Sequence, residues 1–401
     1  MQIYDAVIVG GGIGGLALGC RLANNRRSVL ILEARSGISP SQRGLTLQPN
    51  GLEALQKLGL LERTIRIGTR SDIVAWYEIA GGLLANLDYS LLEHPQNYLL
   101  TVVPSELEQV LRHEFSRTNG VIHESASFEG FKLCKDHVQV KSRGDGSTAE
   151  CSTKILVGAD GADSRVRTAL HVKTQTRECP DHFLFMLVGP VEALRQEARQ
   201  YLSRGKMAGF FPVPGGTYIF YYLPRGKLND LKAQGLNSFK NELQKIMPEL
   251  AGSINNLQSW DDITYAAPKR IKVQSWVGDR VAIIGDAAHA LDPSWAQGAN
   301  MTLQDAISLG DTIEGCFQSD DFSSARLKTY ENARRKQTTF IQKQADRSAQ
   351  LTSTENRFNS WLGKRVLKKT GMNRRLIRIA LNASCGLTDH FTIGEQLRFL
   401  L

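Results

Sequence analysis

An α/β fold, interrupted by a β-rich insertion and closed by helices, is predicted by three observations. The chain begins with an apolar segment, a glycine-rich turn, a helix-like segment and a second apolar segment, which together form the start of a βαβ unit. Residues 182–224 carry β-branched and aromatic residues around a Pro-Gly-Gly turn, as antiparallel hairpins do. From about residue 298 onward the pattern is mostly helical.

Taken in order, the α/β part begins with strands at 4–9 and 28–33 around a helix at 13–23. A helix at 49–59 has Pro49 in its first turn and Gly59 at its end. Further strands are expected at 72–79, 83–89 and 154–160, and a helix at about 105–117. An amphipathic helix at 238–250 precedes an apolar strand at 281–285, and a long polar-rich helix is expected near 323–350.

Composition excludes several classes of protein. The 401 residues suffice for two domains or one large discontinuous domain, and no apolar run reaches membrane-spanning length. Because a strand is predicted from Tyr4 onward, we expect no secretory signal. Six scattered cysteines lack metal-ligand spacing, so we expect no metal site, reduced thiols and a cytoplasmic protein.

The net charge of +9 is concentrated near the C-terminus, where residues 361–401 hold eight basic and two acidic residues. These basic residues are not interleaved with stacking aromatics, so no nucleic-acid partner is expected. Residues 374–381 form a basic amphipathic segment. It fits either a helix docked on the body or a peripheral contact with anionic lipid.

The turn at residues 10–15 reads GGGIGG and satisfies GxGxxG, while Glu33 ends the following strand. Glycines permit a tight turn and close approach of the backbone to a pyrophosphate, whose charge lies at the helix N-terminus. An acidic residue about 20 positions later can accept a hydrogen bond from a ribose hydroxyl. The context predicts a Rossmann-like dinucleotide site, because a turn used only for packing does not explain Glu33.

Two further motifs follow predicted buried strands. GADGADSRVR at 158–167 sets Asp160 at a strand end, and a capped turn explains this motif as readily as a ligand contact does. IIGDAAHALDPSWAQGAN at 283–300 sets Asp286 at the end of another strand. Residues 298–300 then open a helix whose free N–H groups suit an electron-rich ring carbonyl.

In this order and spacing, the three motifs resemble those of the class A flavoprotein monooxygenases, the family of para-hydroxybenzoate hydroxylase. The resemblance extends to about residue 345 and implies that FAD and NAD(P)H are the cofactors. It also implies a set of cofactor-binding residues: Gly10, Gly12, Gly14, Gly15, Glu33, Ala34, Arg43, Gly44, Asp160, Asp286, Gln297, Gly298, Ala299 and Asn300.

The same resemblance implies three regions. A discontinuous FAD-binding domain comprises 1–71, 98–180 and 268–345. A β-sheet-rich substrate domain comprises 72–97 and 181–267. A helical C-terminal region comprises 346–401.

The implied activity is NAD(P)H- and FAD-dependent monooxygenation. O2 adds at flavin C4a, and the resulting hydroperoxide hydroxylates a small aromatic, phenolic or quinone-like substrate. A dehydrogenase or reductase of the prenyl-chain reductase type, without oxygen transfer, is the alternative. The chain is expected to be a monomer or homodimer.

Pro293 is expected to shape the reaction pocket, and Tyr222 is the candidate tyrosine facing a phenolic substrate. Candidate substrate contacts are Phe211, Tyr218, Phe220 and Trp295. For each aromatic residue, packing in a core is an equally good interpretation, so the catalytic base stays open.

Two residues depart from the family pattern. Ala296 stands where the family usually has glycine, so a positive φ there would strain the backbone. Pro104 stands where members of the salicylate-hydroxylase type have an arginine, which removes one expected FAD or NAD(P)H contact. Arg43 and Arg112 are the candidate replacements.

Overall fold

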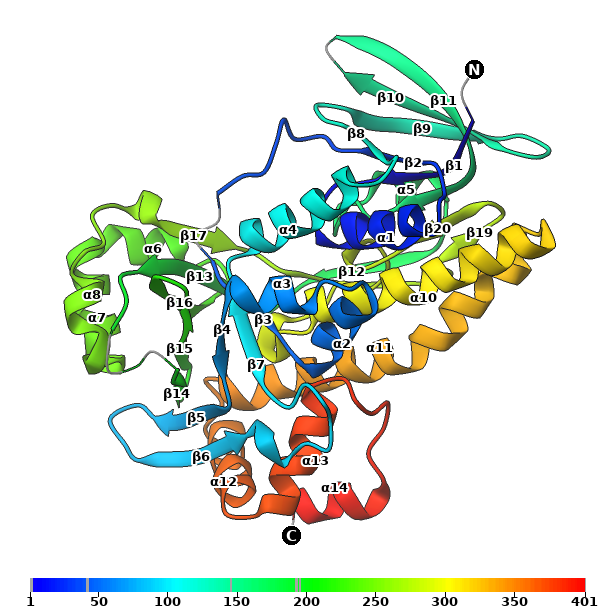
Figure 1. The fold of residues 1–401 in the computed structure, drawn as a ribbon. Coiled ribbons are helices and arrows are strands. Elements are labelled where there is room, and N and C mark those ends of the chain that lie inside the picture. Colours follow the sequence, from blue (N-terminus) through cyan, green and yellow to red (C-terminus); the bar gives the residue numbers. More distant parts are fainter. Residues whose placement is uncertain (1–2, 41–42, 145, 192–193, 195, 401) are drawn as a thin grey trace.

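Two large β-sheets, joined and covered by helices, make up the protein (Figure 1). The computed structural model describes residues 3–40, 43–144, 146–191, 194 and 196–400. The N-terminus lies beside the first sheet, and the C-terminal helices gather at the opposite end of the molecule (Figure 1).

The first sheet has eight strands in the order β19-β20-β11-β1-β2-β8, and β9 and β10 extend it from β11. Pairing is parallel from β20 through β8 and antiparallel along β9, β10 and β11. The strands are β1 (Ile3–Val9), β2 (Val29–Leu32), β8 (Val121–His123), β9 (Ser127–Leu133), β10 (Val138–Gly144), β11 (Ser147–Gly158), β19 (Val277–Gly278) and β20 (Val281–Ile283).

Three helices pack beside this sheet. α1 (Ile13–Asn24) lies on β1 and β2 and contacts both α4 (Pro104–Ser116) and α10 (Gly298–Ser319). β2 is buried along its whole length, as expected for a parallel strand covered on both faces. The carboxyl ends of β1, β11 and β20 therefore meet at one edge, where the three sequence motifs begin.

The second sheet has seven strands in the order β17-β13-β16-β15-β14-β5-β6 and is antiparallel except between β14 and β5. Its inner strands read as continuous apolar runs because both faces are covered. The strands are β5 (Ile73–Glu78), β6 (Leu83–Asp88), β13 (Asp181–Val188), β14 (Ala198–Ser203), β15 (Lys206–Val213), β16 (Gly216–Pro224) and β17 (Ile263–Ala266).

One face of this second sheet packs on α6 (Leu228–Ala233), α7 (Leu236–Ile246) and α8 (Ala251–Ile254). Ile219, Tyr221 and Leu223 of β16 point to that side. Tyr218, Phe220 and Tyr222 alternate with them and belong to a separate apolar cluster on the other face.

Smaller elements complete the fold. β3 (Leu45–Leu47), β7 (Leu99–Val102) and β4 (Gly68–Ser71) form a three-stranded sheet, and β12 (Thr174–Glu178) pairs with β18 (Lys269–Val273). The other helices are α2 (Pro49–Lys57), α3 (Leu61–Arg66), α5 (Arg165–Ala169), α9 (Asp286–His289), α11 (Ser324–Thr352), α12 (Arg357–Gly371), α13 (Arg374–Ser384) and α14 (Ile393–Leu400).

Several expected bounds are corrected. The strand expected at 281–285 ends at Ile283, and Asp286 instead begins α9 after Gly285, whose φ is +61°. The helix expected at 238–250 begins at Leu236 and ends at Ile246, because Pro248 two residues later cannot continue it.

The amphipathic segment at 374–381 is a docked helix. Leu376, Ile379 and Leu381 of α13 are buried against the protein. In the described part of the chain, no helix combines the length and apolar character needed to cross a bilayer.

Candidate active site

The turn at residues 10–15 forms a cradle with room for a pyrophosphate. Gly10 has φ +103°, and a Cβ there would lie 2.4 Å from the Ala159 carbonyl oxygen. A Cβ on Gly15 would lie 1.9 Å from the Gly10 carbonyl oxygen. Gly12 faces open space and caps α1 without a side-chain hydrogen bond, so the first N–H groups of α1 lack a capping side chain. This arrangement fits a dinucleotide.

Glu33 fixes the shape of that turn. One carboxylate oxygen accepts the Gly11 N–H at 2.7 Å, and the other accepts the Arg35 N–H at 2.8 Å. Burial raises the pKa of Glu33, but the hydrogen bonds from Arg35 and Gly11 outweigh it and lower the pKa overall. The carboxylate is therefore ionised at neutral pH, as a partner for a ribose hydroxyl must be, and Ala34 beside it is exposed.

Asp160 is used within its own turn. Its carboxylate accepts hydrogen bonds from the Ser164 hydroxyl and from the Arg165 and Val166 N–H groups, and Ser164 caps α5. Asp160 itself does not line the large cavity described below. Ala162 and Asp163 of the same turn line it instead.

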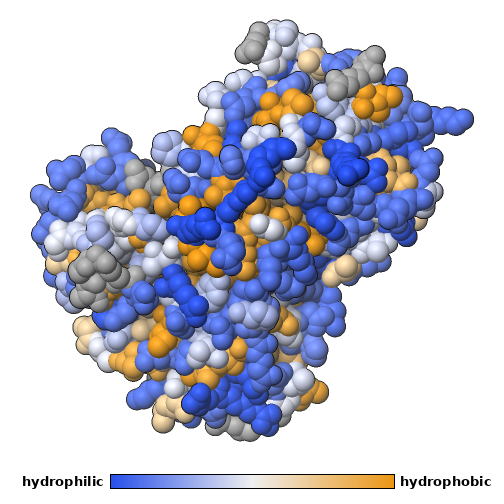
Figure 2. Space-filling view, in the orientation of Figure 1, coloured by the Kyte–Doolittle hydropathy of each residue, from blue (hydrophilic) through white to orange (hydrophobic). Residues whose placement is uncertain are grey.

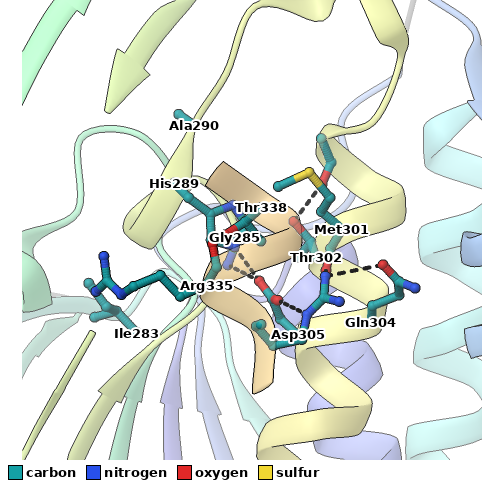
Figure 3. A network of polar contacts seen from close by, with 12 residues as sticks. Ile283, Gly285, His289, Ala290, Met301, Thr302, Gln304, Asp305, Arg335 and Thr338 are labelled. Atoms are coloured by element: carbon teal, nitrogen blue, oxygen red, sulfur yellow. Dashed lines mark hydrogen bonds and ion pairs between the residues drawn. The ribbon is translucent and has the colours of Figure 1, made fainter. Parts of the chain in front are cut away.

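A buried ionic network holds the Gly285-Asp286 turn (Figure 3). Asp305 of α10, with 0% exposure, accepts the Gly285 N–H at 3.1 Å, His289 Nε2 at 2.5 Å and Arg334 Nε at 2.8 Å. Burial raises the pKa of Asp305, but His289 and Arg334 more than compensate and lower the pKa overall. Through Asp305, the buried His289 side chain is linked to the Gly285 N–H, and this link holds the turn in place.

The side chains of Gln297 and Asn300 join elements around the start of α10. Gln297 accepts from Asn50 Nδ2 and donates to the Ser384 carbonyl oxygen. Asn300 accepts the Gln48 N–H and donates to the carbonyl oxygens of Thr46 and Ala296. Both side chains are fully buried, so they position the helix whose N-terminal N–H groups face the cavity.

A cavity of about 490 Å³ lies between the two sheets. On one side it is lined by Arg43, Gly44, Asp286, Gly298 and Ala299. On the face shown in Figure 2, hydrophobic residues gather centrally, between the lobe of α6–α8 and the rest of the molecule.

Asp286 lines this cavity and remains accessible through it. The surrounding protein raises the pKa of its carboxyl group, while the charges of His289 and Arg43 act in the opposite direction. Pro104 lines the same cavity at the first turn of α4, and Arg112 instead pairs with Glu124 at 2.5 Å.

The opposite wall is aromatic. Tyr218, Phe220 and Tyr222 of β16 line the cavity together with Phe211 of β15 and Phe183 of β13. These side chains are at most 8% exposed and pack ring against ring. A Cβ on Gly44 would lie only 2.6 Å from the Tyr218 ring, so glycine fits at this position without a clash.

A chain of polar groups leads away from this wall. The Ser294 hydroxyl lies near the Tyr222 side chain and donates to Asp292, which is 1% exposed. Burial raises the pKa of Tyr222 far above its usual range, and the nearby Asp292 charge adds to the effect. Burial also raises the pKa of Asp292, although Ser294 opposes the shift. Tyr222 is thus an uncharged O–H group near Ser294, which in turn donates to the carboxylate of Asp292.

The loop at 293–296 separates this cavity from a second one. Pro293 lines the first cavity, Trp295 lines the second, and Ser294 and Ala296 line both. Ala296 has φ 49° and ψ 38°, the left-handed conformation that glycine adopts without strain.

Several cavity residues were not foreseen from the sequence, including Ile13, Ser294, Thr302 and Lys269. Ser294 lies inside the quoted 283–300 motif, so its position beside Pro293 was an available signal. Lys269 becomes a neighbour only through pairing of β12 with β18, which the sequence does not reveal.

The cradle for a dinucleotide, the acidic turn after β20 and the aromatic wall define a flavin-dependent oxidoreductase with a cavity for an aromatic ligand. The chain belongs to the FAD binding domain family, which matches residues 3–345.

Its relatives include the 6-methylpretetramide 4-monooxygenase of Streptomyces rimosus, 26% identical over 83% of this chain and 81% of the relative. The 2-heptyl-3-hydroxy-4(1H)-quinolone synthase of Pseudomonas aeruginosa is 26% identical over 94% of each chain. Among solved structures, p-nitrophenol 4-monooxygenase from Pseudomonas putida superposes with a TM-score of 0.85 at 20% identity, covering 98% of this chain and 100% of that one. Klebsiella pneumoniae HpxO, complexed with FAD and uric acid, gives a TM-score of 0.81 at 22% identity, covering 96% and 97%.

The predicted family and α/β FAD-binding fold are confirmed by these matches, as is FAD as a cofactor. NAD(P)H is the typical reductant of this family. The chain is an FAD-dependent monooxygenase, and the alternative of a reductase without oxygen transfer is not favoured.

Proposed function

We propose that the protein hydroxylates an electron-rich aromatic ring held in the first cavity, with NAD(P)H and O2 as co-substrates. The observation that carries this proposal is the aromatic wall of β16 facing Asp286 and Gly298 across one cavity. One relative is named for p-nitrophenol and another for a heptyl-hydroxyquinolone, so family membership leaves the size of the substrate open.

FAD, when bound, supplies electron transfer from NAD(P)H and activation of O2. The N-terminus of α1 at Gly12 would hold its pyrophosphate, Glu33 a ribose hydroxyl and Asp286 the ribityl chain. The N–H groups of Gly298 and Ala299 open α10 and favour negative charge on the adjoining ring. Pro293 and the aromatic wall exclude water.

Tyr222 receives the proton of a phenolic substrate in this proposal. As that proton binds the Tyr222 oxygen, the Tyr222 proton moves to Ser294 and the Ser294 proton to Asp292, which ends protonated. Loss of the phenolic proton makes the ring more electron-rich and hence more reactive. Phe211, Tyr218 and Phe220 hold the ring by apolar contact.

Other expectations remain predictions. They are the division into domains at the bounds given above, a cytoplasmic location, a monomeric or homodimeric state and a peripheral membrane contact. The apolar side of 374–381 is buried, so lipid contact by the C-terminal region would instead use α12, where Phe358 and Trp361 are 64% and 51% exposed beside basic residues.

The reaction is tested with the FAD-loaded protein and a panel of phenols, quinolones and polycyclic aromatics. We expect substrate-stimulated NAD(P)H oxidation and incorporation of one atom of ¹⁸O2 into the product. Formation of the same product without O2 would overturn the proposal.

Tyr222→Phe tests the proton path. We expect kcat to fall roughly 100-fold at unchanged flavin content, because the ring remains while the O–H is lost. Tyr221→Phe is the matched control: Tyr221 lies on the other face of β16 and bonds with Glu242 at 3.1 Å, so its kcat should not change. Equal kcat values in both variants would contradict the role of Tyr222.

A further inference from the structure

A second cavity of about 430 Å³ adjoins the first. Val74 and Leu87 of the second sheet line one side of it, and Val366, Leu367 and Ala380 of α12 and α13 line the other. These helices lie against β6 at the C-terminal end of the molecule (Figure 1).

The two cavities meet at a shared wall. Thr46, Gln200, Phe211, Ser294 and Ala296 line both of them. Phe211 belongs to the aromatic wall and Ser294 to the proposed proton path, so the shared wall lies beside the proposed position of the reacting ring.

Two residues of its lining also carry a buried polar atom without a partner among the described residues, Gln48 Oε1 and Trp76 Nε1. Gln48 is 4% exposed and Trp76 is 8% exposed. Gln48 Nε2 already donates to the Trp295 carbonyl oxygen at 2.6 Å, which leaves its Oε1 as the acceptor. Trp76 pairs in register with Gln200, which lines both cavities.

Apolar surface makes up most of the lining of the second cavity, which indicates that the part of a ligand bound there is mostly apolar. A benzene-sized ring is held by a cavity of about 150 Å³, so a second cavity of about 430 Å³ next to the first exceeds the need of a single ring.

We infer that the second cavity binds an apolar extension of the substrate. The substrate class is an aromatic ring that carries an alkyl, prenyl or fused-ring extension. The ring lies in the first cavity, and the extension passes Phe211 and lies under α12 and α13. This inference rests on the proposed hydroxylation for the position of the ring, and on the second cavity for the extension.

The test uses the FAD-loaded full chain and 4-n-alkylphenols from ethyl to octyl. Kd is measured from the change in the flavin absorbance spectrum, and NAD(P)H oxidation is followed in parallel. We expect Kd to fall by about fourfold for each added methylene until the cavity is filled. A Kd independent of chain length would overturn the inference.

Val366→Trp fills the cavity from α12. We expect the dependence of Kd on chain length to disappear, while the Kd of 4-ethylphenol stays within about twofold. Met372→Trp is the control, because Met372 follows α12 and is 81% exposed, and chain-length dependence should be retained. If both variants behave alike, the second cavity is not the binding site.

Leu367→Ala provides a second readout that does not depend on tolerance of a larger side chain. It enlarges the cavity, so the chain length at which Kd stops falling should increase. An unchanged limit would count against the inference.

The two proposals fail in different ways. If 4-ethylphenol is hydroxylated and Kd ignores chain length, the inference is wrong and the proposed function stands. If Kd follows chain length but no phenol stimulates O2-dependent NAD(P)H oxidation, the extension site stands and the proposed function is wrong.

Discussion

At the scale of single residues, Ala296 combines a strained backbone with a position between two cavities. Its φ of 49° lies in the left-handed region, where the Cβ of an L-residue is crowded by its own carbonyl. The sequence identified this residue as a departure from the usual glycine. The positive φ shows that the departure places backbone strain at this position.

Ala296→Gly is expected to raise the free energy of unfolding by about 0.5–1 kcal/mol. Relief of the left-handed strain exceeds the added flexibility of glycine in the unfolded chain. Ala333→Gly, at an exposed position of helix α11, should instead lower the free energy of unfolding by about 1 kcal/mol. Urea unfolding at saturating FAD measures both values, and a loss of stability in Ala296→Gly would contradict the strain.

Residue types alone indicated Asp160 and Asp286 equally, because both follow buried strands. Only their contacts in the folded structure distinguish the roles of these two residues. Asp160 uses its carboxylate within its own turn, whereas Asp286 opens into the cavity. Hydrogen bonding inside a turn depends on side-chain direction, which a sequence pattern does not contain.

At the scale of elements, Asp305 links α10 to the turn before α9 and to Arg334 of α11. One carboxylate thereby fixes three segments around the proposed flavin site. Asp305 does not line the cavity, so it is a positioning residue.

Asp305→Asn should lower the free energy of unfolding by about 3–5 kcal/mol, since the buried Arg334 loses its counter-charge. We also expect at least a tenfold loss of FAD affinity, because the Gly285-Asp286 turn loses its support. The measurements are urea unfolding and bound flavin per chain after gel filtration.

Asp311→Asn is the matched control, since the Asp311 side chain lies on the same helix and is 55% exposed. Its stability and flavin content should match those of the unchanged protein. If Asp305→Asn retained flavin equally well, the positioning role would be wrong.

At the scale of the whole molecule, Asp181 joins the start of β13 to the end of α11 through the Ser353 hydroxyl. It therefore connects the second sheet to the C-terminal helices that cover the second cavity. Burial raises the pKa of Asp181 to about 6, and the hydrogen bond from Ser353 opposes the shift.

The raised pKa makes stability depend on pH. Between about pH 3.8 and pH 6 the folded chain keeps a proton that the unfolded chain loses, so the free energy of unfolding falls as pH rises. Above about pH 6 the Asp181 carboxyl group is ionised in both the folded and the unfolded chain, so the free energy of unfolding falls no further.

Asp181→Asn, neutral at every pH, should therefore stabilise the protein by up to about 3 kcal/mol at pH 8 and by little at pH 4. Asp261→Asn is the exposed control and should differ from the unchanged protein equally at both pH values. Urea unfolding at the two pH values measures the difference. A pH-independent effect of Asp181→Asn would mean that the bond with Ser353 matters more than burial of the charge.

The sequence by itself determined the βαβ start, the order of the three motifs and the family to which they belong. These features depend on local chemistry: glycine at tight turns, carboxylates at strand ends and an alternation of apolar side chains. The unusual residue Ala296 was also recognised from the sequence, because the backbone conformation of that one position determines which residue types fit it without strain.

The tertiary structure alone decided which aromatic residues share a cavity. It also showed that Gln297 and Asn300 hold elements together, and that a second cavity lies beneath α12 and α13. The wall of the second cavity comes from segments about 300 residues apart and more, such as Val74 and Ala380. Contacts at that distance follow from how sheets and helices pack, and no periodicity within one segment encodes them.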